Sequence, residues 1–400
     1  MADQLANKSL GWKLRKLLTY VRLFGPRWTL AKVQSQRHLA RTAAPEGRFD
    51  NPACSTGDSA RRQVAIIGCG NFAFSVIAFH LRRENPKFLR ATFDIDQARA
   101  VSLCSSYDGA YATPNIQDIL DDDAVQVVFI SSNHATHATY ARQFIEAGKA
   151  VHIEKPHAID GQQMMDLAAA MRRNPSVPVF LGFNRPRSSH FAEVARAMKE
   201  QDGPYMLAWF VAGHMIPEDH WYFAEAEGGR VLGNLCHWLD ASMQLVGEDR
   251  MFPCTLIPSS RPDSKSDFAL TIDCSDGSLV TISFSAKGET FEGVREVLNA
   301  HRGQCLVLLR DFQETRIHVG PRRRVHRTRS REHGHAANIL NSYRKGVNMG
   351  HSVGESIPYV LNSGWLSLAA RHALESGETV TLHASPVVGA SPMEPQASRN

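Results

Sequence analysis

Residues 64–73 decide the fold: Val64-Ala-Ile-Ile67 runs directly into Gly68-Cys-Gly70-Asn71-Phe72-Ala73. The apolar run predicts a short buried β-strand, and the Gly-x-Gly-x-x-Ala stretch predicts a tight turn into a helix. Gly68 permits that turn, Gly70 lets the backbone approach a pyrophosphate, and Ala73 lets the helix pack close to the strand. The helix N-terminus would offer free N–H groups and a positive dipole end to phosphates. The stretch therefore predicts a dinucleotide-binding turn, with a tight strand–helix turn without ligand as the alternative.

The next apolar run supports a dinucleotide. Residues 88–93 predict a second strand that ends at Asp94, 24 residues after Gly70. An acid at that place can bind both ribose hydroxyls of the adenosine. The stretch Asp94-Ile-Asp96 has no arginine beside it to neutralise a 2′-phosphate. The sequence therefore favours NAD over NADP, and NADP stays possible.

The strand–helix alternation continues to about residue 181. Helices are predicted at 96–106, 116–120 and after Ser131–His137 as far as 147, and further strands at 125–130, 150–153 and 177–181. Uniformly apolar strands at this spacing indicate right-handed β-α-β units whose parallel strands are buried on both faces. From about residue 205 longer segments of two-residue period replace them, with Asp276-Gly277 as a hairpin turn signal. These segments are 205–211, 268–274, 279–285, 296–300 and 304–309, followed by helices at 336–346 and 355–376.

These patterns predict an α/β protein. We expect an N-terminal Rossmann domain that binds NAD(P) over residues 61–182 and a C-terminal α+β domain over residues 183–384, with a large, open and mainly antiparallel sheet. Residues 1–60 are expected to form a basic helical extension and linker, the linker lying at 42–61. The tail at 385–400 is expected to be disordered.

Basic charge is concentrated in two places. The net charge is +5, but residues 1–50 hold 10 Lys/Arg and 3 Asp/Glu, a balance of +7, so the remaining chain is −2. Residues 13–24 place apolar side chains on one helical face with basic ones around it, and Gly25-Pro26 ends that helix and opens a second. We expect the apolar face to pack on its own domain or a sister subunit, with membrane-surface contact of residues 11–37 as the alternative. The arginine block at 321–331 is expected to be a solvated loop, with contact to the diphosphate of a nucleotide sugar as the alternative, and no nucleic-acid partner is expected.

The compartment is expected to be cytoplasmic. Seven scattered cysteines without Cys-x-x-Cys spacing argue against a disulfide framework and a thiolate zinc site. The N-terminus lacks the apolar core of a signal peptide, and no apolar run is long enough to span a bilayer. His326, His333 and His335 lack a nearby acid or thiol cluster, so no metal site is expected.

Glu154-Lys155-Pro156, at the end of the strand at 150–153, resembles a motif of the Gfo/Idh/MocA family of sugar and inositol dehydrogenases. Ser131-Ser-Asn133-His134-Ala-Thr-His137 is similar to that family's Thr-Pro-Asn-x-x-His loop, with serine where proline is usual. Gly182-Phe-Asn184-Arg185 resembles the start of its second domain, and residues 228–240 resemble its substrate helix. The resemblance covers roughly residues 62–382.

The resemblance implies hydride transfer between nicotinamide and a secondary alcohol carbon of a sugar, nucleotide sugar or cyclitol. It implies that Lys155 and His237 transfer protons and that the open sheet forms a homo-oligomer interface. The cofactor-binding residues it implies are Gly68, Gly70, Asn71, Phe72, Ala73, Asp94, Ser131, Asn133, His134, His137, Glu154, Lys155 and Arg185. The substrate-binding residues it implies are Asn184, Asn234, His237 and Asp240.

Position 234 departs from the family pattern. Members of the subgroup usually carry an acid three residues before the histidine, and this chain has Asn234. Asparagine can hydrogen-bond a hydroxyl but cannot take its proton. Two alternative functions stay open. The resemblance also admits an NAD-dependent glycosidase, because a few relatives oxidise their sugar transiently. Asn234 and the basic N-terminal extension suggest a catalytically weakened dinucleotide-binding regulatory protein.

Overall fold

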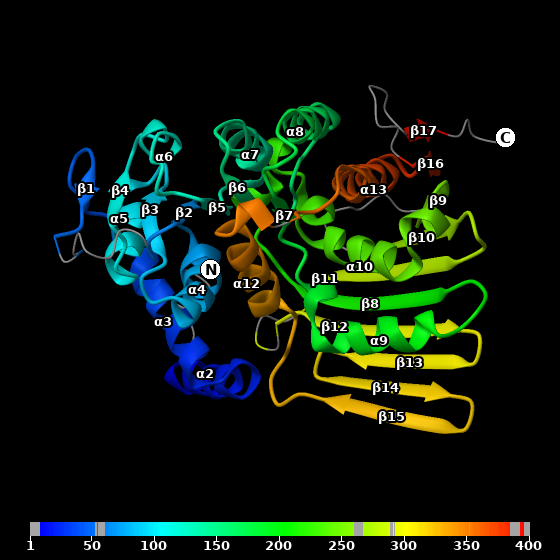
Figure 1. Cartoon of the computed structure of the whole chain (residues 1–400). Coiled ribbons are helices and arrows are strands. Elements are labelled where there is room, and N and C mark those ends of the chain that lie inside the picture. The colour runs from blue at the N-terminus through cyan, green and yellow to red at the C-terminus, as the bar shows by residue number, and fades with distance from the viewer. Residues whose placement is uncertain are drawn as a thin grey trace. The chain divides into compact units, whose positions relative to one another are not determined.

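The computed structural model describes residues 9–52, 54, 61–259, 267–288, 291, 293–351, 353–384 and 393–395. They divide into two compact units (Figure 1). The first takes the described residues of Met1–His157, Asp166–Gly182 and Ala336–Glu355, and the second takes those of Ala158–Met165, Phe183–His335 and Ser356–Asn400. The first unit therefore includes residues 336–355, which were expected in the second domain.

The first unit is built on a parallel sheet. In the described part of the chain its strand order is β1-β4-β3-β2-β5-β6-β7, and every neighbouring pair is parallel except β1 with β4. The central strands β2, β5 and β6 are buried throughout because helices cover both faces. The strands are β1 (Phe49–Asp50), β2 (Val64–Ile67), β3 (Leu89–Phe93), β4 (Tyr111–Thr113), β5 (Val127–Ile130), β6 (Ala150–Ile153) and β7 (Val179–Leu181).

The helix after β2 begins with a π-helical turn at Ala73–Ile77 and continues as α4 (Ala78–Glu84). Aromatic and aliphatic side chains of this helix form a common core with β2, β5 and α12. The other helices are α2 (Leu10–Phe24), α3 (Pro26–Leu39), α5 (Gln97–Ser106), α6 (Gln117–Leu120), α7 (His137–Glu146), α8 (Gly161–Arg173), which runs from the second unit into the first, and α12 (His335–Gly346).

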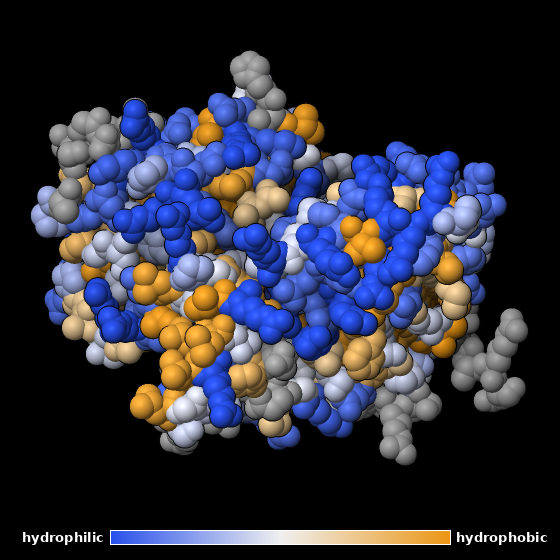
Figure 2. All heavy atoms as spheres, turned by 90° about the horizontal axis from the view of Figure 1, so that it is seen from below, coloured by the Kyte–Doolittle hydropathy of each residue, from blue (hydrophilic) through white to orange (hydrophobic). Residues whose placement is uncertain are grey.

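Helices α2 and α3 precede the sheet, and Gly25-Pro26 separates them as expected. Helix α3 packs on the π-helical turn: the Trp28 indole N–H donates to Ser75 O at 2.7 Å. Helix α2 buries only Lys16 and Leu23, while its apolar stripe is exposed. Figure 2 shows a hydrophobic patch on this side of the molecule. The expected packing of the apolar face on its own domain is therefore wrong for α2.

The second unit is built on a large, mainly antiparallel sheet. Its order in the described residues is β15-β14-β13-β12-β8-β11-β10-β9-β16-β17, with β8 and β11 as the parallel pair. Asp276-Gly277 forms the hairpin between β10 and β11, as predicted. The strands are β8 (Met206–His214), β9 (Cys254–Pro258), β10 (Phe268–Cys274), β11 (Leu279–Gly288), β12 (Arg295–Arg302), β13 (Cys305–Arg310), β14 (Glu314–Val319), β15 (Arg322–Arg327), β16 (Val380–Leu382) and β17 (Met393–Pro395).

The two faces of this sheet differ. Buried side chains alternate with exposed ones along β8, β10 and β13, as a sheet with one covered face requires. Figure 1 shows helices along the covered face. They include α9 (Ser189–Lys199), α10 (Cys236–Val246) and α13 (Ile357–Ser376), and the short α11 (Glu248–Met251) follows α10. None of the described helices has the length and apolar composition needed to cross a bilayer.

The predicted fold class is confirmed, and three local predictions are corrected. The arginine block is not a loop, because residues 322–327 form the exposed edge strand β15, paired with β14. In the predicted linker, Phe49–Asp50 pairs with β4, while residues 53 and 55–60 lie outside the described residues. In the predicted disordered tail, Met393–Pro395 pairs with β16. The remaining residues of 385–400 lie outside the described part.

Candidate active site

The glycine turn has the geometry that a pyrophosphate cradle needs. Gly68 has φ +82°, and a Cβ there would collide with the backbone of Ser132, because the β2 and β5 loops touch. The Ser131 hydroxyl donates to Gly68 O at 3.0 Å. A Cβ at Gly70 would meet no atom within 4 Å, so the space beside this residue is open to a ligand. Ala73 is buried in the helix that follows, as the close helix–strand packing requires.

Asp94 holds the same turn from β3. Its Oδ2 accepts the Cys69 backbone N–H at 2.6 Å, and its Oδ1 accepts the Asp96 N–H at 2.8 Å. A carboxylate has about four lone-pair sites, so it keeps acceptor capacity for ribose hydroxyls. Asp94 therefore serves the glycine turn and, by its chemistry, fits the adenosine ribose.

Sequence reasoning missed the contact between α3 and the glycine turn. The Ser35 hydroxyl lies 2.7 Å from Asn71 Oδ1, and His38 Nε2 lies 2.7 Å from Cys69 O. Burial lowers the pKa of His38, so the neutral ring donates its Nε2–H to that carbonyl. The His38 ring also stacks on Phe74 at 4.5 Å. The only sequence signal was the helical pattern from Pro26, which did not indicate what α3 contacts.

The Asn133 loop is fixed to the turn after β6. His137 is buried, and its ring nitrogens lie 2.8 Å from Pro156 O and 3.0 Å from Ser132 O. Burial lowers the pKa of His137, and because both neighbouring atoms are carbonyl oxygens, a neutral ring donates to only one of them at a time; the ring nevertheless lies between the two loops. His134 is also buried, with its ring centroid 6.0 Å from that of His137. Asn133 Oδ1 accepts the Thr136 hydroxyl at 2.8 Å.

A row of hydrogen-bonded side chains runs from α12 to the end of β6, directly before Lys155. Ser342 Oγ lies 2.8 Å from His152 Nδ1, and His152 Nε2 lies 3.3 Å from Glu154 Oε1. The Lys155 N–H donates to Glu154 Oε2 at 3.4 Å. Glu154 is buried, and its carboxylate accepts the Lys155 backbone N–H. These contacts position the backbone of Lys155, whose side chain is partly exposed.

In the second unit, Arg185 forms a buried ion pair. Its Nε donates to Glu296 Oε2 at 2.7 Å, and the Trp238 indole N–H donates to the same oxygen at 2.8 Å. Burial alone would raise the pKa of Glu296, but the Arg185 guanidinium holds it well below its usual range. Asn184 donates its amide to His333 O at 2.7 Å. Arg185 thus has a packing role within its unit, and this role was not expected.

The predicted substrate helix carries three polar side chains at helical spacing. Asn234 and His237 are partly exposed, and Asn234 Oδ1 lies 3.5 Å from Arg230 Nη1. Arg230 is only 3% exposed and donates to His214 O at 2.8 Å. Among the described residues it has no carboxylate partner, and burial lowers its pKa. The Gly-Gly-Arg sequence before Asn234 could have drawn attention to this cation.

Asp240 lies in a different environment. It is buried, its Oδ1 accepts the Tyr359 hydroxyl at 2.5 Å, and its Oδ2 accepts Gln244 Nε2 at 3.1 Å. These contacts tie α10 to α13. Asp240 therefore holds α10 and α13 together.

Comparison with known proteins identifies the first unit. Residues 62–183 match the model of the oxidoreductase family with an NAD-binding Rossmann fold. These residues belong to the Gfo/Idh/MocA oxidoreductase family. The strand–turn–helix at Gly68 and the acid after β3 both lie within the residues that match this NAD-binding Rossmann family.

Relatives and solved structures extend the similarity beyond this domain. An uncharacterized oxidoreductase of Synechocystis sp. is 26% identical over 61% of this chain and 68% of its own length. Inositol 2-dehydrogenase 2 of Saccharopolyspora erythraea is 24% identical over 55% of this chain and 65% of its own length. Levoglucosan dehydrogenase, solved in complex with NADH, shares the fold with a TM-score of 0.66 at 17% identity, covering 80% of this chain and 98% of that one.

Proposed function

We propose that this chain is an NAD(P)-dependent oxidoreductase that acts on a secondary alcohol carbon of a sugar, nucleotide sugar or cyclitol. The observation that carries the proposal is the Gly68–Ala73 turn with Asp94 beside it, inside a Gfo/Idh/MocA Rossmann domain. The relatives named for inositol and levoglucosan support a polyhydroxylated substrate. When bound, the dinucleotide supplies the hydride acceptor or donor.

Gly68, Gly70, Asn71, Phe72 and Ala73 would hold the pyrophosphate through backbone amides at the start of their helix. Asp94 would hold the adenosine ribose, with NAD favoured. Ser131, Asn133, His134 and His137 would shape the wall of the site through the β5 loop. Glu154 would fix the strand end from which Lys155 acts. Arg185 already donates its Nε–H and Nη2–H to Glu296, so it would reach a cofactor only through Nη1.

Lys155 is the proposed proton acceptor. Oxidation of a secondary alcohol needs a group that takes the hydroxyl proton while hydride leaves the same carbon. A neutral lysine amine can do this, and the buried chain from Ser342 to Glu154 supports a fixed backbone for it.

His237 is the second proposed proton-transfer group, with Asn234 one turn before it as a hydroxyl partner. Asn184, whose amide is already used by His333 O, would contribute its carbonyl side to the substrate. Asp240 would act indirectly, by holding the substrate helix on α13.

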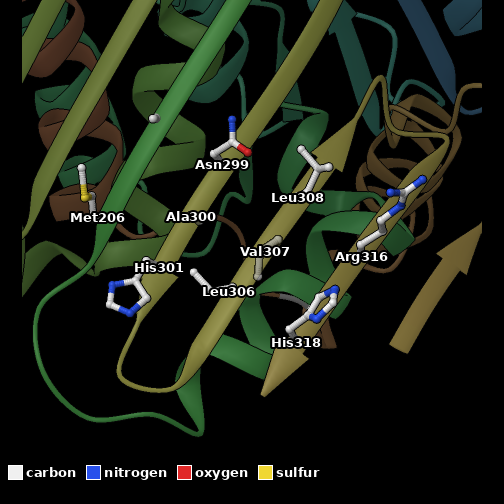
Figure 3. Close-up of a pocket in the computed structure, with 10 residues that line it drawn as sticks. Met206, Asn299, Ala300, His301, Leu306, Val307, Leu308, Arg316 and His318 are labelled. Carbon is white, nitrogen blue, oxygen red and sulfur yellow. The ribbon is translucent and has the colours of Figure 1, made fainter. Parts of the chain in front are cut away.

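We also propose a homo-oligomer through the uncovered face of the large sheet. This face holds a hollow of about 370 Å³ in which side chains of β8, β12, β13 and β14 gather (Figure 3). Met206, Phe210 and Leu306 are each more than half exposed on this face.

A contact of residues 11–37 with a membrane surface is proposed separately, because apolar and basic side chains of α2 and α3 are exposed. The cytoplasm is the proposed compartment, because six of the seven cysteines are buried free thiols.

A substrate panel tests the proposed function. Purified protein is incubated with polyols, sugar acids and nucleoside-diphosphate sugars, each with NAD and with NADP, and both reduced nicotinamide and sugar products are measured. We expect reduced nicotinamide to accumulate with at least one polyol and NAD. Release of an aglycone without net reduced nicotinamide would instead indicate a glycosidase. Dinucleotide binding without turnover on the panel would contradict the oxidoreductase proposal and indicate a binding protein.

A further inference from the structure

Helix α2 turns most of its apolar side chains toward solvent, whereas an ordinary amphipathic surface helix turns them toward the core. Its buried residues are Lys16 and Leu23. Successive residues in an α-helix are rotated by about 100°, so the leucines and valine of α2 fall within an arc of about 100° on the far side. They are between 38 and 84% exposed: Leu10, Leu14, Leu17, Leu18 and Val21. A helix normally turns such a stripe toward a core, so this one is built to be covered by something else.

Basic side chains flank the stripe. The same rotation places Lys13 on one side of it and Arg15 and Arg22 on the other, and all three are exposed. Residues 4–45 contain nine Lys/Arg and no Asp/Glu. Leu30 and Val33 of α3 add two more exposed apolar side chains, 57 and 41% exposed. Figure 2 shows hydrophobic side chains gathered into one patch on the side where α2 lies in Figure 1, with hydrophilic ones beside it.

The hairpin of α2 and α3 is attached firmly to the cofactor unit. Phe24 at the end of α2 contacts Trp28 edge-on at 5.2 Å, and Trp28 packs on His80 at 5.0 Å. The Trp28 indole N–H donates to Ser75 O, in the helix that follows the glycine turn. The stripe of α2 is therefore carried on a fixed support rather than on a free tail.

We propose that residues 10–33 are a docking surface for an anionic lipid bilayer, into which the α2 stripe inserts at headgroup depth. An apolar stripe edged by cations matches a membrane interface, where apolar side chains reach the acyl boundary and Lys/Arg meet phosphate or carboxylate headgroups. Charge decides between this occupant and a second copy of the chain, because the exposed Lys13, Arg15 and Arg22, with no acid anywhere in residues 10–33, would face the same cations across a two-fold axis. The proposal is independent of the reaction that the protein catalyses.

Vesicle flotation tests this surface. The full chain is mixed with phosphatidylcholine vesicles with and without about 30 mol% phosphatidylserine, and the bound fraction is measured in low salt and in about 0.5 M NaCl. We expect binding to the anionic vesicles in low salt, little binding to phosphatidylcholine alone, and weaker binding in high salt. Absence of binding to anionic vesicles in low salt would overturn the proposal.

Two pairs of variants locate the contact. Leu14→Glu with Leu18→Glu should weaken binding by about tenfold or more, whereas Val353→Glu, at a side chain that is 80% exposed elsewhere, should not. Lys13→Glu, Arg15→Glu and Arg22→Glu together should also weaken binding, whereas the matched change of Arg322, Arg323 and Arg329 to glutamate should change it little. If both sets of basic-to-glutamate changes weakened vesicle binding equally, the attraction would be unspecific, and the proposal would be contradicted.

Two controls keep the outcome interpretable. Because the stripe faces away from the protein, the α2 variants should keep the thermal midpoint and the NADH affinity of the parent. Light scattering then reports the molar mass of each variant. If the α2 substitutions halve the mass while vesicle binding is absent from the parent, the stripe is a contact between copies and the lipid proposal is wrong.

Discussion

At the scale of single residues, Asp94 connects the backbone of the glycine turn to the proposed ribose site. Asp94→Ala should weaken NAD binding about 10- to 100-fold, because charged hydrogen bonds to two hydroxyls contribute about 1.5–3 kcal/mol. Asp96→Ala is the matched control, since Asp96 caps α5 through Ala98 N rather than holding the turn. Titration of protein fluorescence with NADH measures both. If Asp94→Ala bound NADH as tightly as the parent, the proposed ribose site at Asp94 would be contradicted.

Asp94→Asn separates the two tasks of this side chain. Asparagine keeps an acceptor for the Cys69 N–H but loses the negative charge and part of the acceptor capacity. We expect an affinity between those of the parent and the alanine variant.

Arg230 predicts a preference for anionic substrates. A buried guanidinium without a carboxylate partner is costly unless an anion compensates it, and this one lies beside Asn234 on the predicted substrate helix. Arg230→Met should lower kcat/KM about 10-fold or more for a sugar acid or phosphorylated sugar, and less for a neutral polyol. Equal losses on charged and neutral substrates would mean that Arg230 only supports His214 O.

Local sequence patterns predicted the positions of several candidate site residues but not their surroundings. Gly68, Gly70 and Asp94 were predictable because each occupies a fixed place in a local strand–turn–helix pattern. The ion pair of Arg185 with Glu296 and the contact of His38 with Cys69 were not, because their partners lie 111 and 31 residues away. A single sequence carries no signal for such pairs.

At the scale of elements, the contact of α3 with α4 predicts that the stability of the fold depends on pH. Burial, with the charges of Arg83 and Lys32, lowers the pKa of His80 from 6.5 to about 4. The unfolded chain therefore binds a proton that the folded chain rejects, so stability falls as the pH falls below about 6.5. His80 alone should cost about 2 kcal/mol of unfolding free energy between pH 7.5 and pH 5.

His80→Phe tests this contribution. Its Nε2 has no hydrogen-bond partner among the described residues, so phenylalanine removes a buried polar atom together with the titration. Urea unfolding at pH 7.5 and pH 5 should show a smaller pH difference in the variant than in the parent. An identical difference in both proteins would mean that His80 does not titrate on unfolding.

Elements with a clear period were predictable, and short or charged ones were not. Strands β6 and β10 match the predicted ranges, because their apolar runs are bounded by turn residues. Strand β15 was missed because arginines are poor strand signals, yet cations suit an exposed sheet edge that must not pair further. The short strand β4 had too few residues to show a period.

At the scale of the whole molecule, the uncovered face of the large sheet predicts self-association. Leu306→Asp places a charge beside Met206 and His301 in the hollow of Figure 3 and should lower the molar mass measured by light scattering. Leu14→Asp on α2 is the matched control and should leave the mass unchanged. If the two variants show the reverse pattern, the copies meet through α2 and not through the sheet.

The role of Lys155 is tested most directly by single-turnover reduction of bound NAD. Parent and Lys155→Ala protein are premixed with saturating NAD and then with the best substrate of the panel, and nicotinamide absorbance is followed in time. We predict rapid reduction in the parent and a rate at least about 100-fold lower in the variant, with unchanged NADH affinity. Reduction at the parental rate in Lys155→Ala would contradict the proposed mechanism.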